Sequence, residues 1–527
     1  ARKKLLYLFS INEISIRKLR SMMDYNRSAG ILLHPTSLPG DYGIGELGSE
    51  AIKFIDFLRD SGQTLWQIFP LGPTGYGDSP YQSFSTFAGN PYLISFEKLH
   101  EEGLLSQSDL DLMPPSNANQ IDYGAIYNNK YKLLYIAYEN MKKSGKLIID
   151  ECGNFCDENK DWLEDYALFM AVKNYHDGVH WQEWDEEIAF RKNDAVSKWK
   201  KMLFDEVGFQ KFMQFKFAEQ WKAVRKYANE KGIQIIGDLP IFVAYDSSDV
   251  WANKKLFTVD KNGKLKTVAG VPPDYFSPTG QLWGNPLYKW NEMKKDKFLW
   301  WRKRLEKMYE LVDIVRIDHF RGLEAFWEIP GDAENAIDGK WVKAPGKELF
   351  TVFEETFGDI KILAEDLGVI TPEVEELRDT FNLPGMKILQ FAFGLTGDKN
   401  FLPHNHIKNC CVYTGSHDND TTRGFFLNEK KSNSGIYEWA QRYLNYYGDD
   451  LCHAAIVSAY QSVANIVIIP MQDVLNLGTE ARMNFPSKLG GNWMWRFTWS
   501  QFDDGLRHRF ADLAKLYERY DENGNKE

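Results

Sequence analysis

Short, continuous apolar segments recur along the chain, and each ends in a polar or glycine-rich turn. Eight such segments begin at Gly30, Thr64, Ile233, Asp313, Lys361, Met386, Cys410 and Ala464. Unbroken apolarity is typical of strands that are covered on both faces. Helical periodicity follows most of them, most clearly in "SEAIKFIDFLRDSG", where Ser49 is the expected N-cap and Gly62 ends the helix. Eight strand and helix units predict an α/β fold, a closed (β/α)8 TIM barrel with large helical insertions.

The chain is longer than this barrel requires. A plain barrel needs about 250 residues, whereas the chain has 527. We expect a helical N-terminal extension over residues 1–28, a catalytic barrel over 29–500, and a C-terminal helix with a polar tail over 501–527. Within the barrel we expect a charged, aromatic, helical insertion at about 99–232 and a second insertion at about 245–295. No Pro/Ser-rich linker separates these parts, so we expect one catalytic unit.

Charge and cysteine content exclude several classes of protein. The net charge of −11, with no long Lys/Arg block, argues against a nucleic-acid binder. No segment approaches the ~20 apolar residues of a membrane helix. The opening "ARKKLLYLFSINEIS" predicts an amphipathic helix rather than a signal peptide. Five cysteines without paired metal spacing argue against a disulfide framework or zinc site and favour the cytoplasm.

Three carboxylates follow different apolar segments. Asp318, Glu365 and Asp418 each come after a predicted strand, and the carboxyl ends of barrel strands meet at one mouth. Such a group serves either a metal or a glycoside-type reaction, and no metal-binding motif accompanies it. Arg316, two residues before Asp318, shares its strand face and should keep it ionised. Each carboxylate alone has a plain alternative role as a helix cap, but the group with Arg316 and His417 favours catalysis.

The longer motifs carry a family resemblance. They are "GILLHPTSLPGDYGIGELG", "LGPTGYGDSPYQSFSTFAGNPYLI", "GDLPIFVAYDSSDVW", "VRIDHFRG", "AEDLG", "GSHDND" and "TEARMNFPSKLGGNWMWR". From about residue 29 to 496 the chain resembles the amylomaltases, the 4-α-glucanotransferases of glycoside hydrolase family 77, in their bacterial form. The resemblance implies that Asp318 is the nucleophile, Glu365 the acid/base and Asp418 the third carboxylate, which binds sugar hydroxyls. A covalent step then predicts retention and a carboxyl separation of about 5–5.5 Å.

The resemblance also implies which residues contact substrate. They are Arg316, His319, His417, Asp366, Tyr76, Ser79, Tyr81, Asp238, Tyr275, Trp283 and Asn484. The stretch 268–286 matches a loop over the cleft, whose aromatic residues would face an acceptor; a rigid surface loop is the alternative from sequence alone. Asp238 is alternatively a turn cap, and we expect Trp493 to belong to the core. His34 is equally a structural residue or a substrate contact.

The expected substrates are α-1,4-glucans, maltooligosaccharides and glucose, with no cofactor and no metal. Two other functions stay open at this point. One is an α-amylase-like hydrolase, which shares the first half of the reaction but passes the sugar to water. The other is a catalytically silent barrel that binds glucan. The oligomeric state is not indicated by the sequence.

Overall fold

A closed barrel of eight parallel strands forms the centre of the protein. The computed structural model describes residues 26–144, 151–192, 194–273, 277–393, 399–432, 434–486, 488, 490–502 and 504–520. The barrel strands are β1 (Ser28–Leu32), β2 (Leu65–Gln67), β3 (Gln234–Pro240), β6 (Ile314–Asp318), β9 (Ile362–Ala364), β10 (Gly385–Ile388), β11 (Cys410–Tyr413) and β12 (Ile466–Pro470). Around the barrel the order is β1-β12-β11-β10-β9-β6-β3-β2. Each predicted apolar segment supplies one strand, so the (β/α)8 prediction is confirmed.

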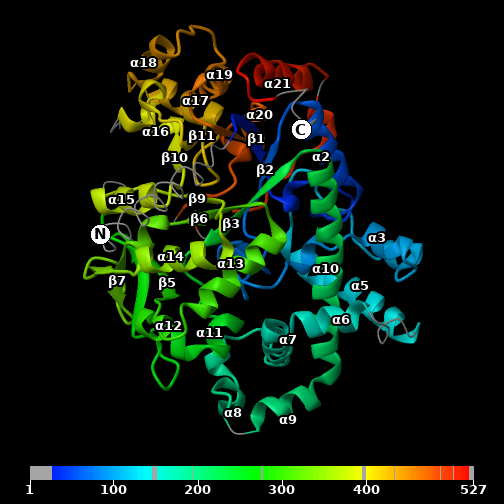
Figure 1. Ribbon diagram of the computed structural model, residues 1–527. Coiled ribbons are helices and arrows are strands. Elements are labelled where there is room, and N and C mark those ends of the chain that lie inside the picture. The colour runs from blue at the N-terminus through cyan, green and yellow to red at the C-terminus, as the bar shows by residue number, and fades with distance from the viewer. Residues whose placement is uncertain are drawn as a thin grey trace, which may run out of the picture.

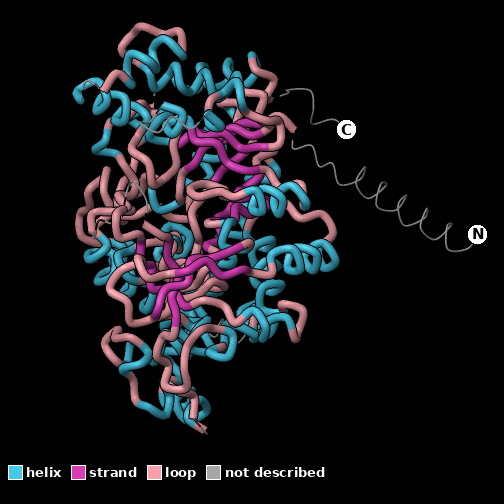
Figure 2. The backbone as a smooth tube through the Cα atoms, turned by 90° about the vertical axis from the view of Figure 1, so that its left-hand side faces the viewer, coloured by secondary structure: helices cyan, strands magenta, loops and turns pink. Residues whose placement is uncertain are grey.

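Helices surround the strands, as the views in Figures 1 and 2 show. Those beside the barrel are α2 (Ser49–Asp60), α13 (Leu299–Leu311), α14 (Gly346–Phe357), α15 (Pro372–Thr380), α16 (Leu389–Phe393), α17 (Thr422–Ser432), α18 (Ile436–Tyr443), α19 (Leu451–Gln461), α20 (Met471–Val474) and α21 (Asp504–Leu516). Their apolar faces pack inward; α2, for example, buries Phe54 and Leu58. In the described part of the chain no helix is long and apolar enough to cross a membrane.

The start of α2 differs from the sequence prediction. Ser49 is the first helical residue, and the N-cap is Gly48, which has no side chain to cap the helix. The Ser49 N–H instead donates to the Glu97 carboxylate at 3.0 Å. The expected Ser49 cap is therefore wrong, because a carboxylate distant in sequence takes over the capping bond.

A set of helices between β2 and β3 extends away from the barrel. It comprises α3 (Phe96–Glu101), α4 (Gln107–Leu110), α5 (Tyr123–Lys143), α6 (Glu151–Glu158), α7 (Lys160–Tyr175), α8 (Glu186–Ala189), α9 (Ala195–Met202) and α10 (Phe204–Glu230). Helix α10 contacts α2, α13 and β3 as well as α5, α6, α7 and α9. In Figure 1 it runs from α2, beside the barrel, down to the outlying helices. The long helix thus belongs to both parts. The domain limits given above stay predictions.

A second, smaller sheet is built from two strands that precede β6 in the chain and two that follow it, and the sequence analysis did not predict it. Its antiparallel order is β5 (Gln281–Pro286), β4 (Thr267–Val271), β7 (Ala325–Pro330) and β8 (Lys340–Lys343). The short helices α11 (Ser248–Ala252) and α12 (Trp290–Lys294) flank β4 and β5 in the chain. Two aromatic-rich runs separated by a segment containing Gly, Asp and Asn, "AFWEIP" and "KWVK", were the available hairpin signal. The sheet brings part of the segment 245–295 next to the residues that follow β6.

Two arginines hold the seam where the first and last barrel strands meet. Strand β1 pairs with β12, and both Arg27 and Arg519 donate to backbone carbonyls beside this pairing. Arg519 donates to Ser462 O at 2.9 Å and Ala464 O at 3.0 Å, while Arg27 donates to Ser462 O at 2.8 Å and to Tyr517 O at 2.9 Å. Arg519 is 1% exposed. These bonds lie at the start of the strands, opposite the barrel mouth.

Candidate active site

Strand β6 ends in the charged residues that the sequence singled out. Arg316 is buried in the strand, and its Nη1 donates to Asp318 Oδ1 at 3.2 Å. The same nitrogen donates to Asp238 Oδ2 at 2.5 Å. Asp238 lies on β3 directly opposite Arg316 in the strand register. One guanidinium is therefore shared by two carboxylates on neighbouring strands, and it lies at the base of the barrel mouth.

Glu365 follows β9, the next strand around the barrel from β6. Its Oε2 accepts the His319 N–H at 2.6 Å and its Oε1 accepts the Leu367 N–H at 3.0 Å. Burial raises the pKa of Glu365 to about 8; the charge of Arg316 opposes this shift and the charge of Asp318 adds to it. Because burial exceeds the effect of the two N–H donors, Glu365 holds its proton near neutral pH.

Asp318 is the more acidic of the two neighbouring carboxyls. Burial raises the pKa of Asp318 to about 7, and Arg316 counteracts that rise. Its side chain keeps 30% of its surface exposed, so water at the mouth also moderates the effect of burial. The two groups interact and titrate as a pair. Since Arg316 contacts Asp318 directly, a single shared proton resides on Glu365.

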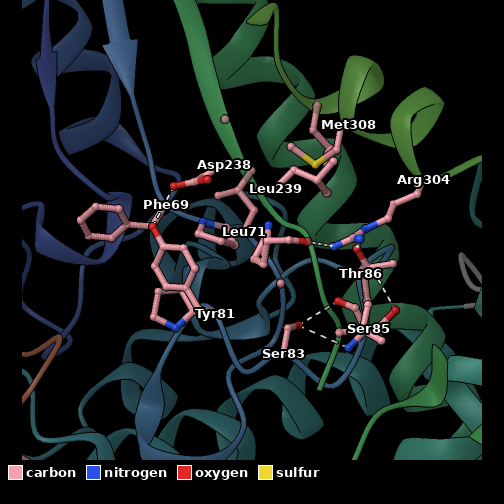
Figure 3. A pocket seen from close by; sticks show the side chains of 18 of the residues that line it. Phe69, Leu71, Tyr81, Ser83, Ser85, Thr86, Asp238, Leu239, Arg304 and Met308 are labelled. Carbon is pink, nitrogen blue, oxygen red and sulfur yellow. Dashed lines mark hydrogen bonds between the residues drawn. The ribbon is translucent and has the colours of Figure 1, made fainter. Parts of the chain in front are cut away.

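Asp418 follows β11 and lies at the exposed edge of the mouth. Its Oδ1 accepts a hydrogen bond from Asn484 Nδ2 at 2.7 Å and lies 3.5 Å from His417 Nε2. The His417 ring stacks on Tyr81 at 5.0 Å between centroids. The Tyr81 hydroxyl in turn donates to Asp238 Oδ2 at 2.7 Å, as Figure 3 shows. This chain of contacts links the Asp418 edge to Arg316 and therefore to Asp318.

The loop that carries Asp418 is held by Asp473, a residue that the sequence analysis missed. Asp473 Oδ2 accepts the hydroxyls of Thr414 and Thr422, each at 2.6 Å, and its Oδ1 accepts the Thr422 N–H at 2.7 Å. Thr414 and Thr422 stand at the two ends of the loop, and Asp473 is 2% exposed. Its position in α20, the short helix that directly follows β12, was the available signal, since it obeys the same strand-end rule as the other carboxylates.

His319 and Trp283 form one wall beside Asp318. His319 adopts a left-handed backbone conformation with φ 56°, and its ring meets the Trp283 ring edge-on at 4.8 Å. The His319 Nε2 has no hydrogen-bond partner among the described residues. Burial lowers the pKa of His319 to about 3, so the ring is neutral. A strained backbone that aims a side chain at a site is frequent where function requires it.

The remaining predicted contacts differ in position. Ser79 Oγ accepts the Tyr81 N–H at 3.2 Å and so shapes the turn that presents Tyr81. The backbone of Tyr76 lies in the 3₁₀ turn Tyr76–Asp78, but its side chain lies outside the described part of the chain. Tyr275 also lies outside the described residues. Both therefore stay predictions.

Asp366, another predicted substrate contact, accepts hydrogen bonds from other residues of the protein with both of its carboxylate oxygens. Its Oδ2 accepts Arg378 Nη1 at 2.5 Å and its Oδ1 accepts the Met386 N–H at 2.7 Å. His34, buried beside the site, accepts the Phe69 N–H at its Nδ1. Trp493 is 5% exposed. Hydrogen bonds anchor Asp366 and His34, whereas the Trp493 ring packs against the rings of Phe69, Tyr81 and His417.

The cavity drawn in Figure 3 is lined by Tyr81 and Asp238, but not by Asp318, Glu365 or Asp418. Its volume is about 40 Å³, far below the ~300–1,000 Å³ of small-molecule sites. A sugar ring does not fit there. Substrate must therefore reach Asp318 from the open mouth, where Asp418 is exposed. Among the described residues no group of three or more His, Cys, Asp or Glu side chains is arranged to hold a metal ion.

A parallel barrel with an ionised carboxylate, a protonated carboxyl and a third acid at its mouth has the groups of a retaining glycoside-processing enzyme. The comparisons agree. A family model described as 4-alpha-glucanotransferase, glycoside hydrolase family 77, matches residues 33–501. The chain belongs to this family and has the fold and the transferase activity that define it.

The relatives match nearly the whole chain. A 4-alpha-glucanotransferase of Synechocystis is 48% identical over 94% of this chain and 99% of its own, and one of Thermus thermophilus is 47% identical over 94% and 100%. The structure of an amylomaltase from Streptococcus agalactiae in complex with acarbose matches with a TM-score of 0.90, at 38% identity, covering 94% of this chain and 100% of its own. The similarity therefore includes both the barrel and its additions.

Proposed function

We propose that this protein carries out glucan transfer by a double displacement in which Asp318 is the nucleophile. Its ionised oxygen attacks the anomeric carbon of an α-1,4-linked glucan and forms a covalent glucosyl ester. Glu365 gives its proton to the leaving 4-oxygen. It then takes a proton from the 4-hydroxyl of the acceptor, which attacks the ester and restores the α-configuration. The contact of Arg316 with Asp318 supports this assignment, because a cation beside Asp318 favours its ionised form and leaves the shared proton to Glu365.

The other site residues bind and orient the sugar. The exposed Asp418 oxygen, held by Asn484, is suited to accept ring hydroxyls of the donor sugar. His319 follows Asp318 in the chain and His417 lies beside Asp418, and their neutral rings are suited to donate to uncharged sugar hydroxyls. Burial lowers the pKa of both histidines. We assign Asp366 to anchoring β10 rather than to substrate, since both of its oxygens already accept protein donors.

We further propose linear maltooligosaccharides and starch or glycogen chains as donors, with glucose or another glucan as acceptor, in the cytoplasm. The relative that matches in structure binds acarbose. Transfer rather than hydrolysis requires that water be kept from the ester. Trp283, on β5 and packed against His319, supports a role for the segment 268–286 as a cover that presents an apolar face to the acceptor.

The test is incubation of the purified protein with maltotriose while glucose, longer oligomers and reducing ends are measured together. Transfer predicts glucose together with maltopentaose and higher oligomers, at a constant number of reducing ends. A steady rise in reducing ends would instead identify a hydrolase. Asp318→Asn is the control for contaminating activity: it should abolish product formation, and unchanged product formation would revive the silent glucan-binding barrel.

A further inference from the structure

Arg482 lies two residues before Asn484, whose side chain holds the Asp418 carboxylate at the barrel mouth. Next to Arg482 in the chain, Ala481 and Met483 are 2% and 5% exposed. Arg482 and Asn484 are only partly buried, and both donate hydrogen bonds to Asp418. The alternation of burial therefore turns these two side chains toward the same residue, while their neighbours anchor the segment in the core.

The guanidinium of Arg482 joins two backbone carbonyls that are distant in sequence. Its Nη2 donates to Asp418 O at 2.6 Å, and its Nε donates to Asn484 O at 2.8 Å. The two carbonyls belong to residues 66 positions apart in the chain. Because Nε and Nη2 belong to one rigid, planar group, the two oxygens are held at a fixed spacing. Both bonds are charge-assisted and therefore about twice as strong as bonds between neutral groups.

The same two residues are joined a second time through their side chains. Asn484 Nδ2 donates to Asp418 Oδ1 at 2.7 Å. From the described residues Asp418 Oδ2 accepts no hydrogen bond, and the side chain is 50% exposed. The backbone contacts of Arg482 therefore set where the amide meets the carboxylate, and the amide leaves one carboxylate oxygen open for a sugar hydroxyl.

Arg482 acts on a different part of the Asp418 loop from Asp473. Asp473 binds the two ends of the loop, whereas Arg482 binds Asp418 itself, from a separate segment. The guanidinium carbon lies 4.5 Å from the centroid of the Phe485 ring. Phe485 is held in turn, because its N–H donates to Asn492 Oδ1 at 3.0 Å. Arg482 is thus braced by a fixed ring, as a group that orients another residue must be.

We propose that Arg482 is a positioning residue for the transfer reaction: it fixes the Asp418 backbone against that of Asn484, so that Asp418 Oδ2 is presented to the donor sugar. This inference rests on the proposed function, in which Asp418 accepts ring hydroxyls of that sugar. Such hydrogen bonds strengthen in the transition state. A misplaced acceptor oxygen therefore lowers kcat more than it raises KM.

The experiment measures kcat and KM for glucose release from maltotriose by two variants of the full chain, with thermal melting to confirm that each is folded. Arg482→Ala should lose ~10–100-fold in kcat, while its KM changes by less than about threefold. Arg482→Lys keeps the charge but not the planar fork, so it should lose less than Arg482→Ala but still at least about threefold in kcat. An unchanged kcat in either variant would overturn the proposal.

Arg423 provides a matched control. Its Nη1 also donates to a backbone carbonyl, that of Asn476, at 2.9 Å, but it bonds to neither Asp418 nor Asn484. Arg423 is exposed, so Arg423→Ala should keep kcat within about twofold of the parent. A loss in Arg423→Ala as large as that in Arg482→Ala would show that removing any nearby arginine has this effect, and would refute a specific role for Arg482.

A double-variant comparison tests whether Arg482 acts through Asn484. In a chain that already carries Asn484→Ala, adding Arg482→Ala should lower kcat by less than about threefold further, because the amide that Arg482 positions is already absent. Losses that multiply as independent effects would overturn the proposal. Asp318→Asn keeps this test separate from the proposed function: transfer that persists in Asp318→Asn overturns the proposed function, whereas transfer lost there but unchanged in Arg482→Ala overturns only the positioning role.

Discussion

Replacing Arg316 by glutamine tests whether a shared cation sets the proton positions in the site. The substitution keeps side-chain length and removes the charge that lies 3.2 Å from Asp318 Oδ1. At an effective dielectric constant near 20, a charge pair about 4 Å apart is worth about 4 kcal/mol, or about 3 pKa units. Arg316 also donates to Asp238, and the negative charge of Asp238 reduces the effect of Arg316 on the pKa of Asp318. We therefore expect the pKa of Asp318 to rise by ~2–3 units from about 7.

The consequence is a change in pH dependence as well as in rate. The nucleophile must be ionised, so the acid limb of kcat/KM follows the pKa of Asp318, and the basic limb follows loss of the Glu365 proton. At pH 7 the ionised fraction of Asp318 falls from about one half to between ~10⁻² and ~10⁻³, and kcat/KM should fall by ~50–500-fold. Part of this activity should return as the pH rises, until Glu365 ionises.

The assay is glucose release from maltotriose over a range of pH, with thermal melting to confirm that the variant is folded. Arg316→Lys is the matched control, since it keeps the charge but not the forked geometry. Its acid limb should stay close to that of the parent even where its rate is lower. A loss of activity in Arg316→Gln that is equal at every pH would refute the electrostatic argument and leave Arg316 with a purely positioning role.

Three further predictions concern other contacts. Asp473→Ala removes the three bonds that fix both ends of the Asp418 loop, so kcat/KM for maltotriose should fall by ~10–100-fold. Asp473→Asn keeps a hydrogen-bond acceptor and should retain more of this activity; equal losses in the two variants would show that these bonds do not position the loop. Burial raises the pKa of Asp249 to about 6, above the ~3.8 of an unfolded aspartate, so its contribution to stability is present below pH ~4 and lost as the pH rises through about 6. Denaturant titrations from pH ~4 to above pH 6 should show the free energy of unfolding of the parent falling by about 3 kcal/mol relative to that of Asp249→Asn. An equal pH dependence of the two proteins would show that Asp249 does not titrate in this way. Trp283→Ala should increase the reducing ends formed per glucose released from maltotriose; an unchanged ratio would show that Trp283 does not shield the ester.

The barrel could be predicted from the sequence because burial on both faces leaves an unbroken apolar run. Strand β12, "IVIIP", is buried at every position and has no polar residue to confuse the pattern. Strand β8, "KWVK", is short and mostly exposed, so its periodicity carries little signal. The four-stranded sheet was missed for that reason. Local rules also failed at Ser49, because the carboxylate that accepts its N–H is 48 residues away in the chain.

From the sequence, the site could be predicted only through charged residues that follow the barrel strands. Asp318, Glu365 and Asp418 follow strands and lie at one mouth, but Asp473 follows a strand too and binds two threonines instead. Which carboxylates remain open to a ligand depends on loop geometry. The sharing of Arg316 with a residue of β3 required the register of two strands that are 78 residues apart in sequence. Such a pairing has no local pattern from which to infer it.

The arginines at the seam of the barrel have a consequence for biosynthesis. Arg519 bonds to the carbonyls beside β12, and Arg27 bonds to the same carbonyl of Ser462 and to Tyr517. During translation β1 leaves the ribosome long before β12 and Arg519 do. It therefore cannot form its pairing with β12 until those later residues have been synthesised. The seam is therefore completed only after Arg519 has been synthesised, and the edge of β1 that pairs with β12 stays unpaired until then. Chaperone capture during synthesis is expected to centre on that edge.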